Sequence, residues 1–274
     1  MYMLIKNTVT LHNGIEMPVL GLGVYLIDNS NANQIINTAI HNGYRSIDTA
    51  PIYGNEEGIG KGIRESGIDR KDLFITSKIW NNDSYAETFS AFNQTLQNLG
   101  LEYLDLYLIH WPGKNKFKNT WRALEELYIN QKIKAIGVSN FHIHHLNDLI
   151  SIANIKPMVN QVEFHPLLTQ KSLIDFCKQE NIQLEAWSPL MQGNLMTNNT
   201  LLQISHKYNK SVAQIILKWD LQNGVVTIPK TINEKRLLEN MNIFNFELST
   251  EDMKKIDNLN QDKRLGADPD LAVF

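Results

Sequence analysis

Eight short apolar runs, separated by segments of helical periodicity, constrain the fold of this 274-residue chain more than any other feature. The runs are Val19–Gly23, Ser46–Asp48, Leu73–Lys78, Leu104–His110, Ala135–Ser139, Met158–Gln161, Gln183–Trp187 and Val225–Pro229. The helical stretches between them include Asn33–His41, Ala86–Asn98, Lys118–Asn130, His144–Ile150, Gln170–Gln179 and Val212–Gln222. Strands that alternate with helices form a parallel sheet, and eight such units predict one closed (β/α)8 TIM barrel over residues 1–274.

Two further patterns refine this prediction. Thr8–Glu16 has the pattern of two short strands around an Asn13-Gly14 turn, which is typical of a β-hairpin that could plug one end of the barrel. The alternative fold is an open, doubly wound sheet. The Gly-x-Gly-x-x-Gly turn typical of that fold is missing, because Gly21-Leu-Gly23 is followed by Val24-Tyr25-Leu26.

Composition and charge argue against several classes of protein. The net charge is −3 and the isoelectric point is about 6.2, which does not favour nucleic acid or an acidic membrane surface as a partner. The single cysteine, Cys177, cannot form an intramolecular disulfide. The start of the chain is too polar for a signal peptide, and no apolar run approaches the roughly 20 residues of a membrane span. We therefore expect a cytoplasmic protein that is monomeric by default.

The predicted strands end in chemically useful residues. In a barrel the C-terminal ends of all strands share one face, where active sites are built. Several polar side chains should therefore converge on one mouth: Asp48, Lys78, His110, Ser139-Asn140, Gln161, Trp187-Ser188 and Lys230.

These residue types fit acid catalysis by a tyrosine. Tyr53 lies five residues past the strand that ends at Asp48, so a loop can aim it into the mouth. A free tyrosine, with a pKa near 10, is a weak acid at neutral pH, and we expect the ammonium of Lys78 to lower that pKa. Asp48 would hold the lysine charged, and His110 could donate a hydrogen bond to a substrate carbonyl. No side chain carries a hydride, so a reduction would need a cofactor.

The ordered motifs around these four residues resemble the aldo-keto reductase family, in particular its bacterial glyoxal and 2,5-diketogluconate reductases. The resemblance covers nearly the whole chain and implies that Asp48, Tyr53, Lys78 and His110 are catalytic. The matching segments are Gly43-Tyr-Arg-Ser-Ile-Asp-Thr-Ala50 with Glu56 and Gly60, Ile75-Thr-Ser-Lys78, and Leu108-Ile-His-Trp-Pro112.

The resemblance also implies a site for NADPH. Ser139, Asn140 and Gln161 would bind the nicotinamide carboxamide, and Trp187 would stack on the nicotinamide where the family usually has tyrosine. Lys230 and Arg236, near the start of a helix, suit a 2′-phosphate and so favour NADPH over NADH. The remaining predicted cofactor contacts are Ser188, Leu190, Thr231, Glu239 and Asn240.

The expected substrate is a small carbonyl compound. Tyr25, Trp80, His110 and Trp111 would wall the substrate pocket, and the brief tail Gly266–Phe274 would leave it open. An open aromatic pocket favours small dicarbonyls or aromatic aldehydes, which the protein would reduce to alcohols.

Other conspicuous residues have simpler interpretations. His142, His144 and His145 could indicate a metal site, but adjacent histidines at a helix start should point to different faces, so we expect a solvated helix terminus and no metal. The residues predicted to be structural are Tyr44, Arg45, Trp121, His165, Cys177 and Trp219.

Two rival functions remain open at this point. A cofactor-binding sensor or regulatory protein could use the same barrel, although the four intact catalytic residues argue against it. An aldolase or isomerase barrel would need a Schiff-base lysine without a tyrosine partner. That reading would not explain Ser139-Asn140 together with Lys230 and Arg236.

Overall fold

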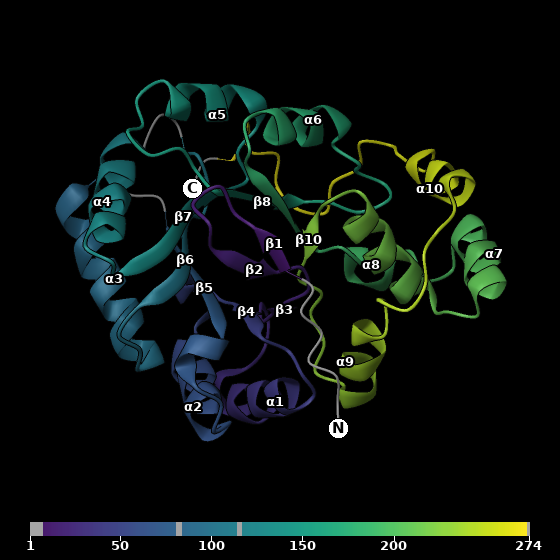
Figure 1. The fold of residues 1–274 in the computed structure, drawn as a ribbon, viewed down its shortest axis with the longest axis horizontal. Helices are drawn as coiled ribbons and strands as arrows, with labels where there is room; N and C mark the ends of the chain where they lie inside the picture. The colour runs from purple at the N-terminus through teal and green to yellow at the C-terminus, as the bar shows by residue number, and fades with distance from the viewer. Residues whose placement is uncertain (1–7, 81–83, 114–116, 273–274) are drawn as a thin grey trace.

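The computed structural model describes residues 8–80, 84–113 and 117–272, and this part of the chain forms a barrel of parallel strands ringed by helices (Figure 1). In the described residues the sheet has eight strands in sequence order. A parallel bridge between Leu20, just before the first strand, and Thr227 in the last strand closes the sheet, and the amide of Gly21 donates to the Thr227 carbonyl at 3.0 Å. The predicted barrel is confirmed, and the open doubly wound sheet is wrong. The strands are β3 Leu22–Gly23, β4 Ser46–Asp48, β5 Phe74–Ile79, β6 Leu104–Ile109, β7 Ile133–Ser139, β8 Val159–Glu163, β9 Gln183–Trp187 and β10 Val226–Thr227.

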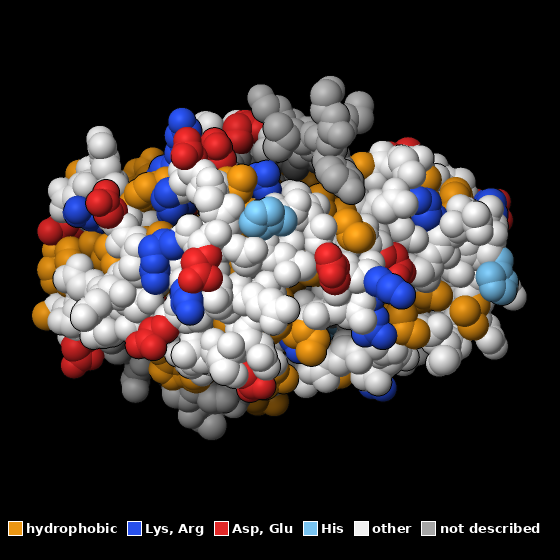
Figure 2. All heavy atoms as spheres, turned by 90° about the horizontal axis from the view of Figure 1, so that it is seen from below, with side chains coloured by type: hydrophobic (Ala, Val, Ile, Leu, Met, Phe, Trp, Pro, Cys, Tyr) orange, Lys and Arg blue, Asp and Glu red, His pale blue; other side chains and the backbone are white. Residues whose placement is uncertain are grey.

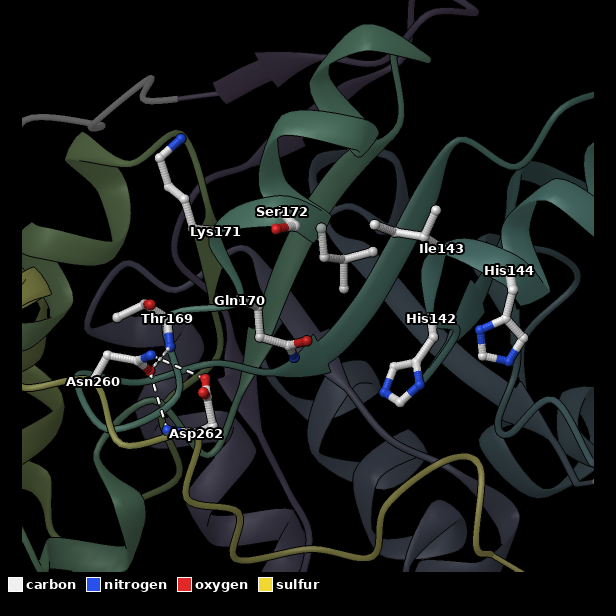
Figure 3. A pocket seen from close by; sticks show the side chains of 10 residues that line it. His142, Ile143, His144, Thr169, Gln170, Lys171, Ser172, Asn260 and Asp262 are labelled. Carbon is white, nitrogen blue, oxygen red and sulfur yellow. Dashed lines mark hydrogen bonds between the residues drawn. The ribbon is translucent and has the colours of Figure 1, made fainter.

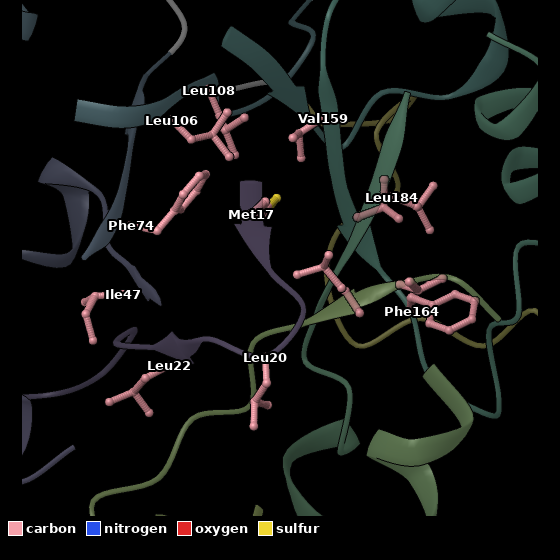
Figure 4. Close-up of a cluster of buried hydrophobic side chains, with 14 of the residues drawn as sticks. Met17, Leu20, Leu22, Ile47, Phe74, Leu106, Leu108, Val159, Phe164 and Leu184 are labelled. Carbon is pink, nitrogen blue, oxygen red and sulfur yellow. The ribbon is translucent and has the colours of Figure 1, made fainter. Parts of the chain in front are cut away.

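The predicted hairpin closes the end of the barrel where the strands begin. Strands β1 (Thr8–Thr10) and β2 (Glu16–Pro18) pair antiparallel, and they cross the middle of the ring in Figure 1. The Asn13 side chain donates to the carbonyl of Lys134, in the first part of β7, at 2.9 Å. Met17 is fully buried among side chains that line the barrel interior (Figure 4). The hairpin therefore seals this end with apolar contacts, and the opposite mouth is left for chemistry.

The helices cover the outside of the sheet, and the six predicted helical stretches are all helical. Helix α2, which was not among those predicted, contains glycines that lower helix propensity. They allow close packing: a Cβ on Gly60 would lie 2.0 Å from the Leu99 carbonyl oxygen. The helices are α1 Asn29–His41, α2 Glu56–Glu65, α3 Tyr85–Leu99, α4 Lys118–Ile129, α5 Ile143–Ile150, α6 Lys171–Gln179, α7 Asn199–Tyr208, α8 Val212–Gln222, α9 Glu234–Met241 and α10 Thr250–Asp257.

Most of the residues predicted to be structural are buried in the packing. Trp121 and Trp219 are buried on helices, and burial raises the pKa of the Cys177 thiol to about 12. The Tyr44 hydroxyl donates to the Leu237 carbonyl at 3.2 Å. Arg45 donates to the Ile40 carbonyl at 2.9 Å. The hydrogen bonds of Tyr44 and Arg45 thus hold α9 and α1 to the barrel.

The molecular surface is mixed in character. Figure 2, which looks from below Figure 1 toward the side carrying α1, α2 and α9, shows basic and acidic side chains interspersed among apolar ones. Each helix in the described ranges is too short or too polar to cross a membrane.

Candidate active site

Lys78 is the centre of the predicted catalytic group. Its ammonium is completely buried near the end of β5, where it donates to Asp48 Oδ1 at 2.6 Å and to the Thr49 carbonyl at 3.1 Å. It also donates to the Tyr53 hydroxyl at 3.4 Å. Tyr53 ends a short 3-10 turn, Pro51–Tyr53, that follows β4. Lysine, aspartate and tyrosine therefore form one connected group at the barrel mouth.

The net effect on the pKa of Tyr53 differs from the prediction. Burial raises the pKa of this phenol, and the opposing effect of the Lys78 charge is smaller. Lys78 lowers the pKa of Tyr53 as expected, but burial of the phenol, which the prediction did not include, outweighs this effect. On Lys78 burial has the opposite effect and alone would lower the pKa of the ammonium, but Asp48 and Tyr53 outweigh it and raise that pKa. At neutral pH the arrangement holds a protonated phenol beside a charged ammonium.

His110, immediately after β6, completes the group. Its ring lies edge-on to Tyr53, with ring centroids 5.9 Å apart. Burial and the nearby Lys78 charge lower the pKa of His110 well below its usual value. A neutral imidazole has one N–H to donate, which suits a carbonyl oxygen.

The residues predicted to hold the nicotinamide form a second connected group. Ser139 Oγ donates to the Gln161 carbonyl at 2.9 Å. The Asn140 amide donates to the His110 carbonyl at 2.9 Å and accepts from Trp187 Nε1 at 2.9 Å. The hydrogen bond from Trp187 Nε1 to Asn140 thereby fixes the plane of the indole. A tyrosine at position 187 could not make this bond in the same way. Asn140 itself has φ +65°, a left-handed conformation that asparagine tolerates.

Glu185 was missed by the sequence reasoning. Its side chain is completely buried inside the barrel on β9, and its Oε2 accepts from Gln161 Nε2 at 2.8 Å. The same nitrogen donates to Asp48 Oδ2 at 2.7 Å, so both hydrogens of the Gln161 amide are used inside the barrel. The amide oxygen of Gln161 is then the atom left for a ligand. Residues two positions apart in a strand point to the same side, so Glu185 faces the same side of β9 as Trp187. This spacing in an apolar strand could have identified Glu185 from the sequence.

The predicted adenosine-phosphate residues lie around the start of α9. Lys230 and Arg236 are exposed, and the helix is capped by Asn233, whose side chain accepts from the Arg236 amide at 3.2 Å. Thr231 is buried, and its Oγ1 accepts from the Asn233 amide at 3.1 Å. Free N–H groups at a helix start, with two nearby cations, favour a phosphate.

The other predicted cofactor residues are spread over two elements. Asn240, in α9, is buried and hydrogen-bonds the Tyr44 hydroxyl, whereas Glu239 is half-buried. Ser188 has φ +50° and begins the loop after β9 that contains the half-buried Leu190.

The predicted substrate pocket is aromatic. The Tyr25 ring lies 5.0 Å from that of Tyr53 and is 55% exposed. The Trp80 ring meets His110 edge-on at 5.1 Å, and Trp111 is half-buried next to it in sequence. The rings of Tyr25 and His110 thus flank that of Tyr53, and Trp80 extends the aromatic surface beyond His110.

Glu163 ties the C-terminal tail to this site. Its carboxylate is buried, pairs with His165 at 2.9 Å, and accepts from the amides of Leu265 at 2.5 Å and Gly266 at 3.1 Å. Burial alone would raise the pKa of Glu163, but these hydrogen bonds lower it. Gly266 in turn packs on Trp187: an added Cβ would lie 2.5 Å from the indole. His165, predicted to be structural, thus helps to anchor the tail.

The interpretation of the three clustered histidines was wrong in its geometry. One nitrogen each from His142, His144 and His145, together with a carboxylate oxygen of Asp270, all lie within 4.8 Å of one another. The rings therefore converge instead of pointing to different faces.

The last two residues of the predicted tail, 273 and 274, lie outside the described part of the chain, as do residues 1–7.

Known proteins similar to this chain include reductases. A model of the aldo/keto reductase family matches residues 20–261. The glyoxal reductase of Bacillus subtilis (strain 168) is 64% identical over 272 residues, covering 98% of this chain and 99% of that protein. The methylglyoxal reductase DkgA of Escherichia coli (strain K12) is 41% identical over 268 residues, covering 96% and 97%.

Solved structures agree with the sequence matches. An aldo-keto reductase from a Medee basin deep-sea metagenome library, MGS-M4, has a TM-score of 0.94 and 46% identity, covering 97% of this chain and 99% of that one. A mutant of Gox0644 in complex with NADPH also has a TM-score of 0.94, at 39% identity, covering 98% and 99%.

Proposed function

This chain belongs to the aldo/keto reductase family, and on that premise we propose that it reduces small aldehydes and ketones, dicarbonyls such as glyoxal and methylglyoxal among them, to alcohols with NADPH. The observation that carries the proposal is the buried hydrogen-bonded group of Asp48, Lys78 and Tyr53 beside His110. The names of the two similar bacterial reductases support the substrate class.

In the proposed reaction Tyr53 is the proton donor. The chemistry that NADPH supplies when bound is a hydride for the carbonyl carbon. The neutral ring of His110 donates a hydrogen bond to the carbonyl oxygen and orients it. The phenol of Tyr53 gives its proton to that oxygen as charge develops, which yields the alcohol and a phenolate. Lys78, 3.4 Å away, stabilises the phenolate, and Asp48 keeps the lysine charged until solvent returns the proton.

The residues present fit NADPH. Gln161 keeps its amide oxygen for a carboxamide N–H, because Asp48 and Glu185 take both of its hydrogens. The indole of Trp187 is held in one plane by Asn140 and offers a face for an aromatic ring. The adenosine phosphate would be held at the start of α9, by Lys230 and Arg236. The NADPH-bound structure of Gox0644, at 39% identity, supports this assignment.

The test is loss of NADPH absorbance with methylglyoxal, glyoxal and a panel of aromatic aldehydes. We expect turnover with wild-type protein and almost none with Tyr53→Phe, while NADPH binding, followed by quenching of tryptophan fluorescence, stays unchanged. If Tyr53→Phe keeps more than about a tenth of the rate, a difference of only about 1.4 kcal/mol in barrier, Tyr53 is not the principal acid.

The same assay separates the rival functions. A sensor or regulatory protein would bind NADPH but consume none with any carbonyl in the panel. An aldolase or isomerase barrel would act without NADPH and would depend on Lys78 but not on Tyr53.

A further inference from the structure

We propose that His142, His144, His145 and Asp270 form a binding site for a divalent transition-metal ion of the zinc type, outside the reductase site. Asp270 Oδ2 lies 3.1 Å from His142 Nδ1, and Oδ1 lies 3.0 Å from His144 Nε2 and 3.5 Å from His145 Nε2. In a tetrahedral zinc site, with bonds of about 2.0–2.1 Å, neighbouring ligand atoms are about 3.3 Å apart. The three distances from the Asp270 carboxylate are close to that spacing, and the four ligand atoms all lie within 4.8 Å of one another.

Local backbone structure explains why three near-neighbours in sequence converge. His142 is the N-cap of α5, with extended φ and ψ of −77° and 171°, so its side chain does not follow the helical rotation. His145, three residues later, folds back over the cap, where its Nδ1 accepts from the His142 amide at 3.2 Å. The ring centroids of His142 and His145 are then 5.8 Å apart, and those of His144 and His145 are 4.0 Å apart. The helix start gathers the rings on one side.

The fourth ligand comes from the other end of the chain. Asp270 belongs to the C-terminal tail, and its one carboxylate faces all three rings. Imidazole and carboxylate together are a ligand set that zinc accepts, and one negative ligand offsets part of the charge of the ion. A bound ion would cross-link the tail to α5, close after Asn140, which positions Trp187.

Hydrogen bonds on the far side of the rings set the expected affinity. His142 Nε2 lies 3.0 Å from the Arg264 guanidinium, which can only donate, and His145 Nδ1 accepts a backbone N–H. In the metal-free form the protons of these two rings therefore sit on the nitrogens that face Asp270, and an ion must displace them. When one nitrogen of a neutral ring binds the ion, the other carries the proton and can no longer accept. His142 must then release the Arg264 guanidinium, and His145 must release the His142 amide. His144, 59% exposed, is the ligand that can adjust most easily. We expect micromolar binding instead of the tighter binding of closed structural zinc sites.

The site is accessible to an ion. A pocket of about 460 Å³ lies beside the histidines, between the starts of α5 and α6. Figure 3 shows His142 and His144 on one side of this pocket, with Thr169, Asn260 and Asp262 across from them. The pocket gives an ion and its water a route to His142 and His144.

The experiment is a zinc titration of the full chain after removal of any polyhistidine tag, by calorimetry and by competition with a chromophoric chelator. We expect one ion per chain at this site. His144→Ala and Asp270→Asn should each weaken binding by at least about ten-fold. His206→Ala, which removes an exposed histidine of α7, is the matched control and should bind like wild type. Zinc should also raise the melting temperature of the wild type and of His206→Ala, but not that of His144→Ala.

Reductase turnover without zinc serves as the check on folding. Neither His144 nor Asp270 belongs to the catalytic group, so both variants should reduce carbonyls at the wild-type rate. The proposal is overturned if the wild type binds zinc no more tightly than about 1 mM, or if both variants bind it as tightly as the wild type does.

Discussion

Replacing Glu185 with glutamine tests whether the barrel interior keeps a buried carboxyl group protonated at neutral pH. Burial, and then the neighbouring charge of Asp48, raise the pKa of Glu185 to about 8, against the opposing effects of Gln161 and Lys78. Among the described residues, its Oε1 has no hydrogen-bond partner. The ionised form is therefore poorly stabilised in the folded protein, and this carboxyl group holds its proton at neutral pH.

The sign of the pH dependence follows from comparison with the unfolded chain. An unfolded glutamate has a pKa of about 4.3, below the folded value. The contribution of Glu185 to stability is thus fully present below about pH 4 and is lost as the pH rises through the folded pKa. At about 1.4 kcal/mol per pH unit, the wild type should lose roughly 4 kcal/mol from this group between pH 5 and pH 8.

Glu185→Gln removes that titration while keeping the size and shape of the side chain. Its new N–H will lack a partner at the position of Oε1, which costs about 1–3 kcal/mol at every pH. The diagnostic quantity is therefore the slope of the unfolding free energy against pH, and not its value at one pH. Titrating groups that do not interact with Glu185 are present in both proteins and cancel in the difference.

Urea unfolding at half-unit steps from pH 5 to pH 8 measures these slopes. The control is Glu102→Gln, at an exposed glutamate, which should leave the wild-type slope unchanged. Parallel curves for wild type and Glu185→Gln would mean that Glu185 is ionised in the folded protein, and would refute the reasoning.

Three further substitutions test the packing and the site. Lys78→Met leaves the carboxylate of Asp48 buried without its partner, so we expect a loss of about 3–5 kcal/mol in urea unfolding and a fall of about 100-fold or more in turnover. Gly266→Ala should push the Trp187 indole, cost about 1–3 kcal/mol, and weaken NADPH binding as followed by tryptophan fluorescence; unchanged binding would argue against a role for that ring. Ser211→Ala removes the N-cap of α8 and should cost about 1 kcal/mol with no change in turnover.

Much of the fold was predictable because its signals are local. Each barrel strand was found from its own apolar run, and the Asn13-Gly14 turn marked the hairpin. Helix α2 was not predicted, because its glycines serve contacts with other helices that no local pattern reports. Closure of the barrel depends on a bridge between Leu20 and Thr227, which lie at opposite ends of the sheet in sequence.

The grouping of the predicted catalytic residues was predictable for a related reason. Parallel strands in sequence order bring their C-terminal ends to one face, so Asp48, Lys78 and His110 had to be neighbours once the barrel was assumed. The sign of the pKa shift on Tyr53 was not predictable in this way. Burial and the Lys78 charge oppose each other, and their balance depends on how deeply the phenol is packed.

The sequence by itself determined the strand order and predicted which strand ends share one face of the barrel, because both follow from local periodicity and from one topological rule. Only the tertiary structure decided which side chains touch across long stretches of chain. Glu185 meets Gln161 inside the barrel, and Asp270 reaches the histidines at the start of α5. These contacts depend on where separate elements pack, at a precision of about an ångström that no local pattern encodes.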